Sequence, residues 1–138
     1  FVYSIIMNIK TSKELVEEAN KSIKTMSPPE IKEALNKKEV TLIDVRDIRE
    51  LWREGTIKDS IHIPRGMLEF WLDPNSTYYK ENKIGNVKNL VLFCAIGFRS
   101  ALATKALTEM GFDNVANAEG GFDALKSSGL EVVSKEKK

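Results

Sequence analysis

The stretch Leu90-Val91-Leu92-Phe93-Cys94-Ala95-Ile96-Gly97-Phe98-Arg99-Ser100 runs from four apolar residues to the only cysteine of the chain. Residues 101–110 follow, with apolar side chains recurring every three or four positions, and Gly111 comes next. This pattern predicts a buried strand, a tight loop and a helix with one buried face that ends at a glycine. It places Cys94 at the carboxyl end of the strand, facing the first turn of the helix.

That position favours a reactive thiol. The first N–H groups of a helix lack intrahelical partners, and a loop above them adds further inward N–H donors. Such surroundings shift a thiol toward thiolate, which is the nucleophile. Gly97 permits a turn that a side chain would obstruct, and Arg99 adds a permanent cation. The alternative is that Cys94 is a small buried hydrophobe, as free cysteines often are. The glycine, the arginine and the helix start together favour the reactive cysteine.

Length and composition narrow the class of protein. The 138 residues fit one domain, and the formal net charge of +1 gives no sign of a surface for nucleic acid. No apolar run approaches the ~20 residues of a membrane span. A single cysteine excludes an internal disulfide and a cysteine-cluster zinc site, and the sequence implies no metal and no organic cofactor. A thiol that must stay reduced favours the cytoplasm.

The chain divides into three expected parts. Residues 1–23 form an N-terminal extension with one amphipathic helix, which begins at the capping pair Thr11 and Glu14. Residues 24–132 form the main domain, and residues 133–138 form a lysine-rich flexible tail. The first nine residues are apolar but lack the features of a signal peptide, and Met7 is a candidate natural start, which would leave residues 1–6 outside the native protein.

Strands and helices alternate along the main domain. Strands are expected at residues 24–26, 40–45, 61–63, 90–93 and 114–117. Helices are expected after the capping sequence at Ser27 and at residues 47–54, 66–72, 101–110 and 122–126, and residues 78–88 are expected to be loop with a little helix. This alternation predicts an α/β fold, with a parallel sheet between helices on both faces. Ligands of such sheets bind at the carboxyl ends of the strands, which puts one pocket over Cys94.

Other polar residues near those strand ends have two interpretations each. Asp44 and Arg46 either support the Cys94 loop through hydrogen bonds or pair with Glu50 on the surface. Arg65 follows a strand-ending proline, so it either reaches the pocket rim and binds an anionic donor or is simply solvated. His62 is either the base of a Cys-His hydrolase or, as we favour, a core or edge histidine.

Five sets of residues occur in one order between Met26 and about Val132. This ordered set resembles the rhodanese-like sulfurtransferase family, although each motif alone is weak. The matching pieces are Leu42-Ile43-Asp44-Val45-Arg46, then Glu50 with Gly55-Thr56-Ile57, then Ile61-His62-Ile63-Pro64, the loop from Cys94 to Ser100, and Glu119-Gly120-Gly121-Phe122. Three positions depart from the family pattern: Thr56 stands where histidine is common, Asp59 or Ser60 where glycine is usual, and Leu125 where tryptophan is common.

The resemblance implies a three-layer fold with a five-stranded, mostly parallel sheet. It also implies that Cys94 takes sulfane sulfur from a donor such as thiosulfate, becomes a persulfide, and passes the sulfur to a thiophilic acceptor. That acceptor is cyanide in assays and often a small thiol or a protein in cells. Together with the pattern of residues, it assigns donor binding to seven residues, namely Ala95, Ile96, Gly97, Phe98, Arg99, Ser100 and Arg65, and a supporting role to two, namely Asp44 and Arg46.

Two alternatives stay open. A cysteine phosphatase or arsenate reductase uses similar chemistry, but its loop places five residues between cysteine and arginine, and only four separate Cys94 from Arg99. A persulfide carrier or protein-binding module is the other alternative, because Ile96 and Phe98 give the loop an apolar character. Steady-state turnover distinguishes an enzyme from a carrier, which would load once and stall.

Overall fold

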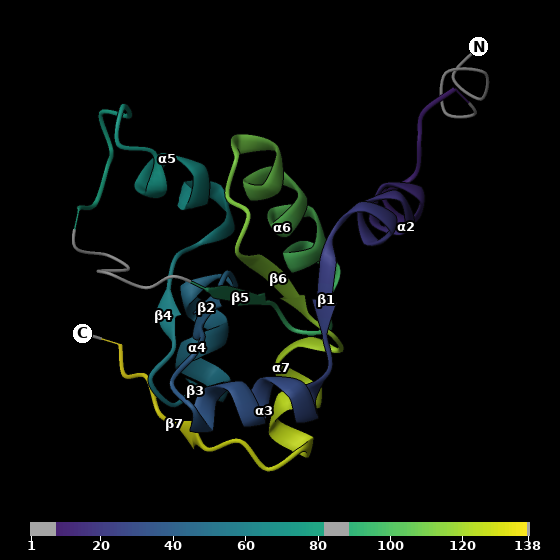
Figure 1. Cartoon of the computed structure of the whole chain (residues 1–138). Coiled ribbons are helices and arrows are strands. Elements are labelled where there is room, and N and C mark those ends of the chain that lie inside the picture. The colour runs from purple at the N-terminus through teal and green to yellow at the C-terminus, as the bar shows by residue number, and fades with distance from the viewer. Residues whose placement is uncertain (1–7, 82–88, 138) are drawn as a thin grey trace.

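The core of the protein is a five-stranded sheet in the order β1-β6-β5-β2-β4 (Figure 1). The strands are β1 (Lys24–Met26), β2 (Thr41–Asp44), β4 (Ile61–His62), β5 (Leu90–Phe93) and β6 (Val115–Ala118). Every neighbouring pair in this sheet is parallel. The computed structural model describes residues 8–81 and 89–137, so the candidate start at Met7, the segment before it and residues 82–88 of the expected loop lie outside the described residues.

Helices cover both faces of this sheet. The helical elements are α2 (Ser12–Ser22), α3 (Pro28–Asn36), α4 (Ile48–Glu54), η1 (Arg65–Met67), α5 (Leu68–Leu72), α6 (Phe98–Met110) and α7 (Gly121–Ser127). Side chains of α3 and α7 pack against Leu42, Val91 and Phe93 on one face. Side chains of α5 and α6 pack against Ile43 and Leu92 on the other face. Neighbouring residues of β2 and β5 thus point to opposite cores, as the pleat requires, and the predicted α/β class with a parallel sheet is confirmed.

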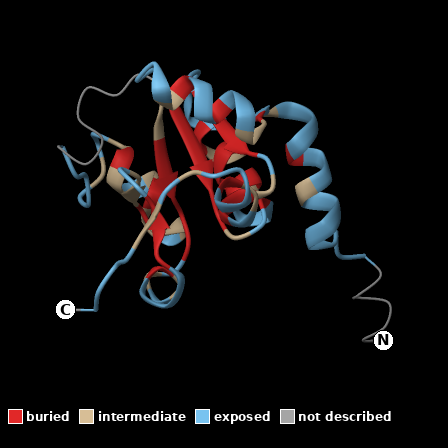
Figure 2. Cartoon of the chain, turned by 90° about the horizontal axis from the view of Figure 1, so that it is seen from below, coloured by how far each residue is buried: buried red, intermediate tan, exposed pale blue. Residues whose placement is uncertain are grey.

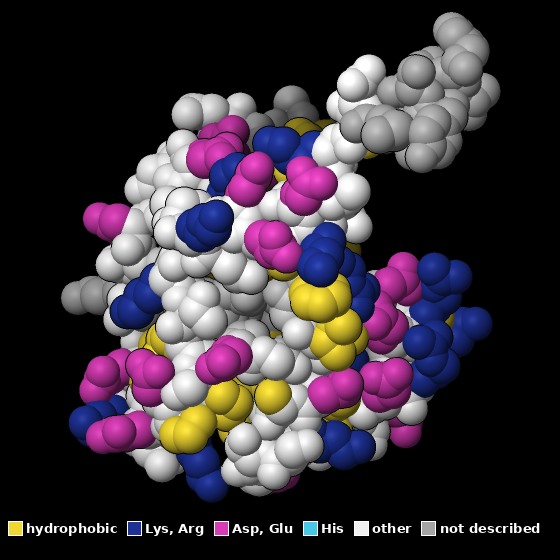
Figure 3. Space-filling model, turned by 90° about the vertical axis from the view of Figure 1, so that its right-hand side faces the viewer, with side chains coloured by type: hydrophobic (Ala, Val, Ile, Leu, Met, Phe, Trp, Pro, Cys, Tyr) yellow, Lys and Arg dark blue, Asp and Glu magenta, His cyan; other side chains and the backbone are white. Residues whose placement is uncertain are grey.

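Figure 2 shows the result of this arrangement, with the central strands β2, β5 and β6 almost wholly buried and the helices exposed on their outer sides. On the face that lies to the right in Figure 1, basic and acidic side chains are interspersed (Figure 3). This mixture agrees with the nearly neutral charge of the chain. No helix within residues 8–81 and 89–137 is both long and apolar enough to cross a membrane.

The sequence located the main elements well. All five strands lie within one residue of their predicted ends. Ser27 begins α3 with the predicted capping box, in which its hydroxyl accepts from Glu30 N–H while the Glu30 carboxylate accepts from Ser27 N–H. At the start of α2, Thr11 Oγ1 accepts from Glu14 N–H at 3.0 Å. Helix α2 packs against α6 at the side of the domain (Figure 1).

Three details differ from the prediction. Helix α6 begins at Phe98 instead of residue 101, because Gly97 adopts the left-handed conformation (φ 105°) that ends the loop. A second, antiparallel sheet joins β3 (Thr56–Ile57) to β7 (Val132–Val133), and two residues per strand are too few to produce a periodic pattern. Since β7 crosses the predicted boundary at residue 132, Val133 is part of the folded domain and not of the tail. Only residues 78–81 of the expected loop are described, and they contain no helix, so the prediction of a little helix within residues 78–88 stays a prediction.

Candidate active site

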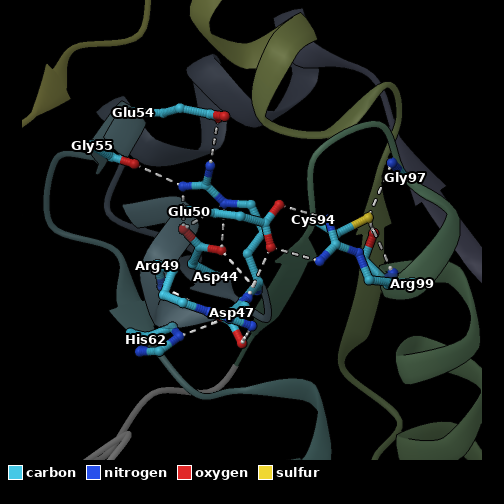
Figure 4. A network of polar contacts seen from close by, with 12 residues as sticks. Asp44, Asp47, Arg49, Glu50, Glu54, Gly55, His62, Cys94, Gly97 and Arg99 are labelled. Atoms are coloured by element: carbon cyan, nitrogen blue, oxygen red, sulfur yellow. Dashed lines mark hydrogen bonds and ion pairs between the residues drawn. The ribbon is translucent and has the colours of Figure 1, made fainter. Parts of the chain in front are cut away.

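Cys94 lies directly after β5, with its sulfur surrounded by hydrogen-bond donors from the start of α6 (Figure 4). Gly97 N–H lies 3.1 Å from Cys94 Sγ, and the N–H and hydroxyl of Ser100 lie at 3.4 and 3.3 Å. The thiol is buried. The predicted placement, a cysteine at a strand end facing the first turn of a helix, is therefore confirmed.

This environment acts on the pKa of the Cys94 thiol in two opposing ways. Burial raises the pKa, because it disfavours the charged thiolate. The hydrogen bonds from Ser100, Gly97 and Ile96 lower it, and together they outweigh the burial, so that the pKa lies below its ordinary value. The donors of Gly97 and Ser100 around Cys94 Sγ, which we call the cradle, therefore stabilise the thiolate, the form in which Cys94 would act as a nucleophile.

Removing one of these donors tests the cradle. Ser100→Ala is expected to slow alkylation of Cys94 by iodoacetamide at neutral pH about three- to tenfold, because a charged group that loses a donor is destabilised. The loss raises the pKa of the thiol, so the rise of the rate with pH should move to higher pH. The measurement is the alkylation rate as a function of pH.

Thr104→Val is the matched control for this variant. Thr104 is also buried on α6, but its hydroxyl donates to the carbonyl of Ser100 at 2.8 Å and not to the sulfur. Its alkylation profile should stay where the wild-type profile lies. If both variants shift the profile equally, the effect of Ser100→Ala comes from disturbance of the helix and not from the lost bond to sulfur.

The first residues of α7 hold the other side of the loop. Phe122 N–H donates to the carbonyl of Cys94 at 2.7 Å, and Asp123 N–H donates to the carbonyl of Ala95 at 3.2 Å. A Cβ atom on Gly121 would lie 2.6 Å from the Cys94 carbonyl oxygen, and Gly121 has φ +62°. Glycine is thus required here because the two backbones approach closely.

Asn117 is a supporting residue that the sequence analysis missed. Its side chain is buried on β6 and donates from Nδ2 to the carbonyl of Gly97 at 3.2 Å. This bond fixes the residue whose N–H faces the sulfur. The available signal was a polar side chain within the short strand Val115–Ala118, since a buried amide needs a hydrogen-bond partner.

Arg99 is bound by Glu50, for which the sequence analysis had suggested only Asp44 and Arg46 as partners. The two guanidinium nitrogens of Arg99 lie 2.7 and 3.0 Å from the two carboxylate oxygens of Glu50. Figure 4 shows the guanidinium between Glu50 and Cys94. The hydrogen bond and charge of Glu50 raise the pKa of Arg99, and the nearby Cys94 sulfur raises it further, although burial lowers it.

Asp44 and Arg46 form a fully buried ion pair beneath the site, with Arg46 Nη2 2.7 Å from Asp44 Oδ2. Arg46 also donates to the carbonyl of Gly55 at 2.8 Å and to Glu54 at 3.3 Å. In the described part of the chain, neither residue hydrogen-bonds to residues 94–100 or forms an ion pair with Glu50. Neither predicted set of contacts, hydrogen bonds to the Cys94 loop or an ion pair with Glu50, forms among the described residues. Asp44 and Arg46 instead pair with each other.

The buried Asp44–Arg46 pair is connected to the Cys94 loop through Phe122. The guanidinium of Arg46 lies over the ring of Phe122, 4.1 Å from its centroid, and it is Phe122 N–H that donates to Cys94. Thr56 completes the pair, because its hydroxyl donates to Asp44 Oδ2 at 2.8 Å. Thr56, which stands where histidine is common in the family, thus still donates a hydrogen bond to the buried carboxylate of Asp44.

Arg65 and His62 have local partners. Arg65 Nη1 lies 2.7 Å from Glu69 Oε1, and both side chains are one-third exposed. His62 Nε2 lies 2.8 Å from the carbonyl oxygen of Arg46, at the end of the edge strand β4. Among the residues that the structure describes, no group of three or more histidine, cysteine, aspartate or glutamate side chains could hold a metal ion.

Comparisons with known proteins agree with this geometry. The family model of the rhodanese-like domain matches residues 27–128. A thiosulfate sulfurtransferase/rhodanese-like domain-containing protein 3 from Mus musculus is 34% identical over 97 residues, which cover 67% of this chain and 62% of the mouse protein. This chain therefore matches about three fifths of the length of that relative.

Two solved structures are also similar. A Rhodopseudomonas palustris protein, described as of unknown function and a possible tyrosine phosphatase, is 39% identical with a TM-score of 0.80, covering 90% of this chain and 95% of that one. A polysulfide-sulfur transferase homodimer from Wolinella succinogenes is 34% identical with a TM-score of 0.68, covering 89% and 87%. With the family match spanning most of the chain, this protein belongs to the rhodanese-like domain family.

Proposed function

We propose that the protein is a sulfurtransferase that moves sulfane sulfur through a persulfide on Cys94. The donor is a small anionic compound such as thiosulfate, and the acceptor is thiophilic: cyanide, a small thiol or the thiol of a protein. The observation that carries this proposal is the cradle of donors from Gly97 and Ser100 around Cys94 Sγ. Such a cradle stabilises an anionic sulfur, which both the thiolate and the persulfide carry.

The reaction has two steps. The Cys94 thiolate attacks the outer sulfur of thiosulfate, a new S–S bond forms, and sulfite leaves with the electron pair of the broken bond. The acceptor then attacks the terminal sulfur of the persulfide, and the Cys94 thiolate leaves. With cyanide the product is thiocyanate, and the enzyme returns to its starting state without any external oxidant or reductant.

Hydrolysis of phosphate esters is the second candidate, since the similar R. palustris protein is described as of unknown function and a possible tyrosine phosphatase. Two observations favour sulfur transfer. Only four residues separate Cys94 from Arg99, whereas a tetrahedral oxyanion needs a larger ring of donors. In addition, the Arg99 guanidinium is already bound on two nitrogens by Glu50.

The proposal is tested by transferring one sulfur atom to the single cysteine and then removing it. Wild-type protein treated with thiosulfate should gain the mass of one sulfur, and cyanide should remove it with formation of one equivalent of thiocyanate. With both substrates present, thiocyanate should then form continuously. Loading without continued turnover would favour a carrier, in which the exposed Ile96 and Phe98 contact a partner protein. Absence of loading together with hydrolysis of an aryl phosphate would overturn sulfur transfer.

We also propose a reducing compartment such as the cytoplasm for this protein. The reason is chemical, because the persulfide cycle starts from a free thiolate, and an oxidising compartment would divert the single thiol into other disulfides. Fractionation of cells that express the protein, followed by trapping of free thiols, tests this expectation. A thiol found mostly oxidised in its native compartment would contradict it.

A further inference from the structure

Both arginines that the sequence assigned to donor binding are held by carboxylates. Arg65 pairs with Glu69 at 2.7 Å, and Arg99 makes two bonds to Glu50 at 2.7 and 3.0 Å. A guanidinium that holds a carboxylate through two nitrogens uses the geometry by which it binds other anions best. Arg99, whose guanidinium lies beside Cys94, therefore adds less positive charge at the approach to the sulfur than a free arginine would.

Glu50 is itself held firmly in place. Its Oε2 atom accepts a hydrogen bond from Asp47 N–H at 3.0 Å, as part of the capping box that begins α4, and its side chain is only 17% exposed. The hydrogen bond from Arg99 lowers the pKa of Glu50, although burial raises it in part. The carboxylate is thus ionised at neutral pH and keeps one position beside the guanidinium.

We propose that Glu50 is a specificity-determining residue, which lowers the preference of the site for doubly charged sulfur donors relative to singly charged ones by offsetting the charge of Arg99. A cleft with a net charge concentrates ligands of the opposite sign, and this effect grows with the charge of the ligand. Compared with a site in which Arg99 is unopposed, the preference therefore shifts from doubly charged toward singly charged sulfane donors. This donor preference rests on the proposed function.

The variant Glu50→Gln isolates the charge, because glutamine still accepts the bond from Asp47 N–H at this capping position. The first measurement compares alkylation of Cys94 by iodoacetate, an anion, and by the neutral iodoacetamide. Both reagents react with the thiolate and release iodide, so any change in thiol acidity cancels in the ratio of the two rates. We expect that ratio to rise about three- to tenfold in the variant. An unchanged ratio would overturn the inference.

The second measurement compares two donors that differ by one charge. Thiosulfate carries two negative charges and releases sulfite, and methanethiosulfonate carries one and releases methanesulfinate, while both leave the same persulfide on Cys94. The ratio of kcat/KM for thiosulfate to that for methanethiosulfonate should also rise about three- to tenfold in Glu50→Gln. Transfer with an unchanged ratio would overturn the donor preference alone. No transfer from either donor to wild-type protein would overturn the proposed function, and the donor preference with it.

Glu109→Gln is the control for the overall charge of the protein. Glu109 lies near the far end of α6, about 15 Å along the helix from Arg99, and its partner is Lys105. This variant removes the same charge from the protein but should leave both ratios at their wild-type values. A shift as large as that of Glu50→Gln would assign the effect to net charge and overturn the role of Glu50.

Discussion

Cys94→Ser is expected to lower thiocyanate formation from thiosulfate and cyanide by about a thousandfold or more, to the background rate. A serine hydroxyl remains protonated at neutral pH, so it cannot attack the donor in the way a thiolate does. It also offers no sulfur on which a persulfide could form. The measurement is the steady-state rate of thiocyanate formation, with intact mass confirming that the variant gains no sulfur.

The controls for this variant separate chemistry from folding. Serine is close in size to cysteine, and the donors of Gly97 and Ser100 can bond its oxygen, so the urea unfolding midpoint should change little. Glu109→Gln, remote from the sulfur, should retain wild-type turnover. If Cys94→Ser remains folded and still turns over, the nucleophile is another group and the persulfide mechanism is wrong.

Arg46→Met is expected to lower the free energy of unfolding by about 3–5 kcal/mol. The side chains of Arg46 and Asp44 are both fully buried, and loss of the guanidinium leaves a carboxylate in the core without its cation. The variant also removes the group that lies over Phe122. Because small domains are stable by only about 5–15 kcal/mol, the change should be plain in urea unfolding monitored by tryptophan fluorescence.

Two further variants show whether burial causes this loss. Arg49→Met removes an arginine that also pairs with an aspartate, but its side chain is 72% exposed, so its unfolding midpoint should stay close to that of the wild type. The double variant Asp44→Asn with Arg46→Met removes both charges and should be less destabilised than the sum of the two single variants. A loss for Arg46→Met no larger than for Arg49→Met would contradict the account of the buried pair.

Local signals in the sequence were sufficient for most of the elements and for the position of Cys94 between a strand and a helix. The four apolar residues before Cys94 define a strand because they are buried on both faces of the sheet, and the capping box at Ser27 fixes a helix start through bonds three residues apart. These features depend on neighbours in the chain. The same holds for the loop, where Gly97 and the start of α6 lie within a few residues of the sulfur.

The remaining site depends on contacts between distant segments, for which periodicity and spacing carry no signal. Glu50 and Arg99 are 49 residues apart, and the first pairing suggested for Glu50 was with residues much nearer in sequence. Asn117 meets Gly97 only because β6 lies beside β5 in the sheet. The sequence therefore identified residues 94–100 of the loop, but it did not identify Glu50 and Asn117 as residues that hydrogen-bond to that loop.

The pairing of β1 with β6 has a consequence for how the site comes into being during synthesis. Lys24 in β1 lies opposite Ala116 in β6, so these two strands of the sheet can pair only after the roughly 90 residues between them have been made. The hydrogen bond from Phe122 N–H to the carbonyl of Cys94, which helps to hold the loop, involves a residue that is made later still. Contacts of such long range form slowly. Until they form, the Cys94 loop lacks these supporting contacts, and we expect its thiol to have the ordinary acidity of a free cysteine, mostly protonated at neutral pH and slow to react.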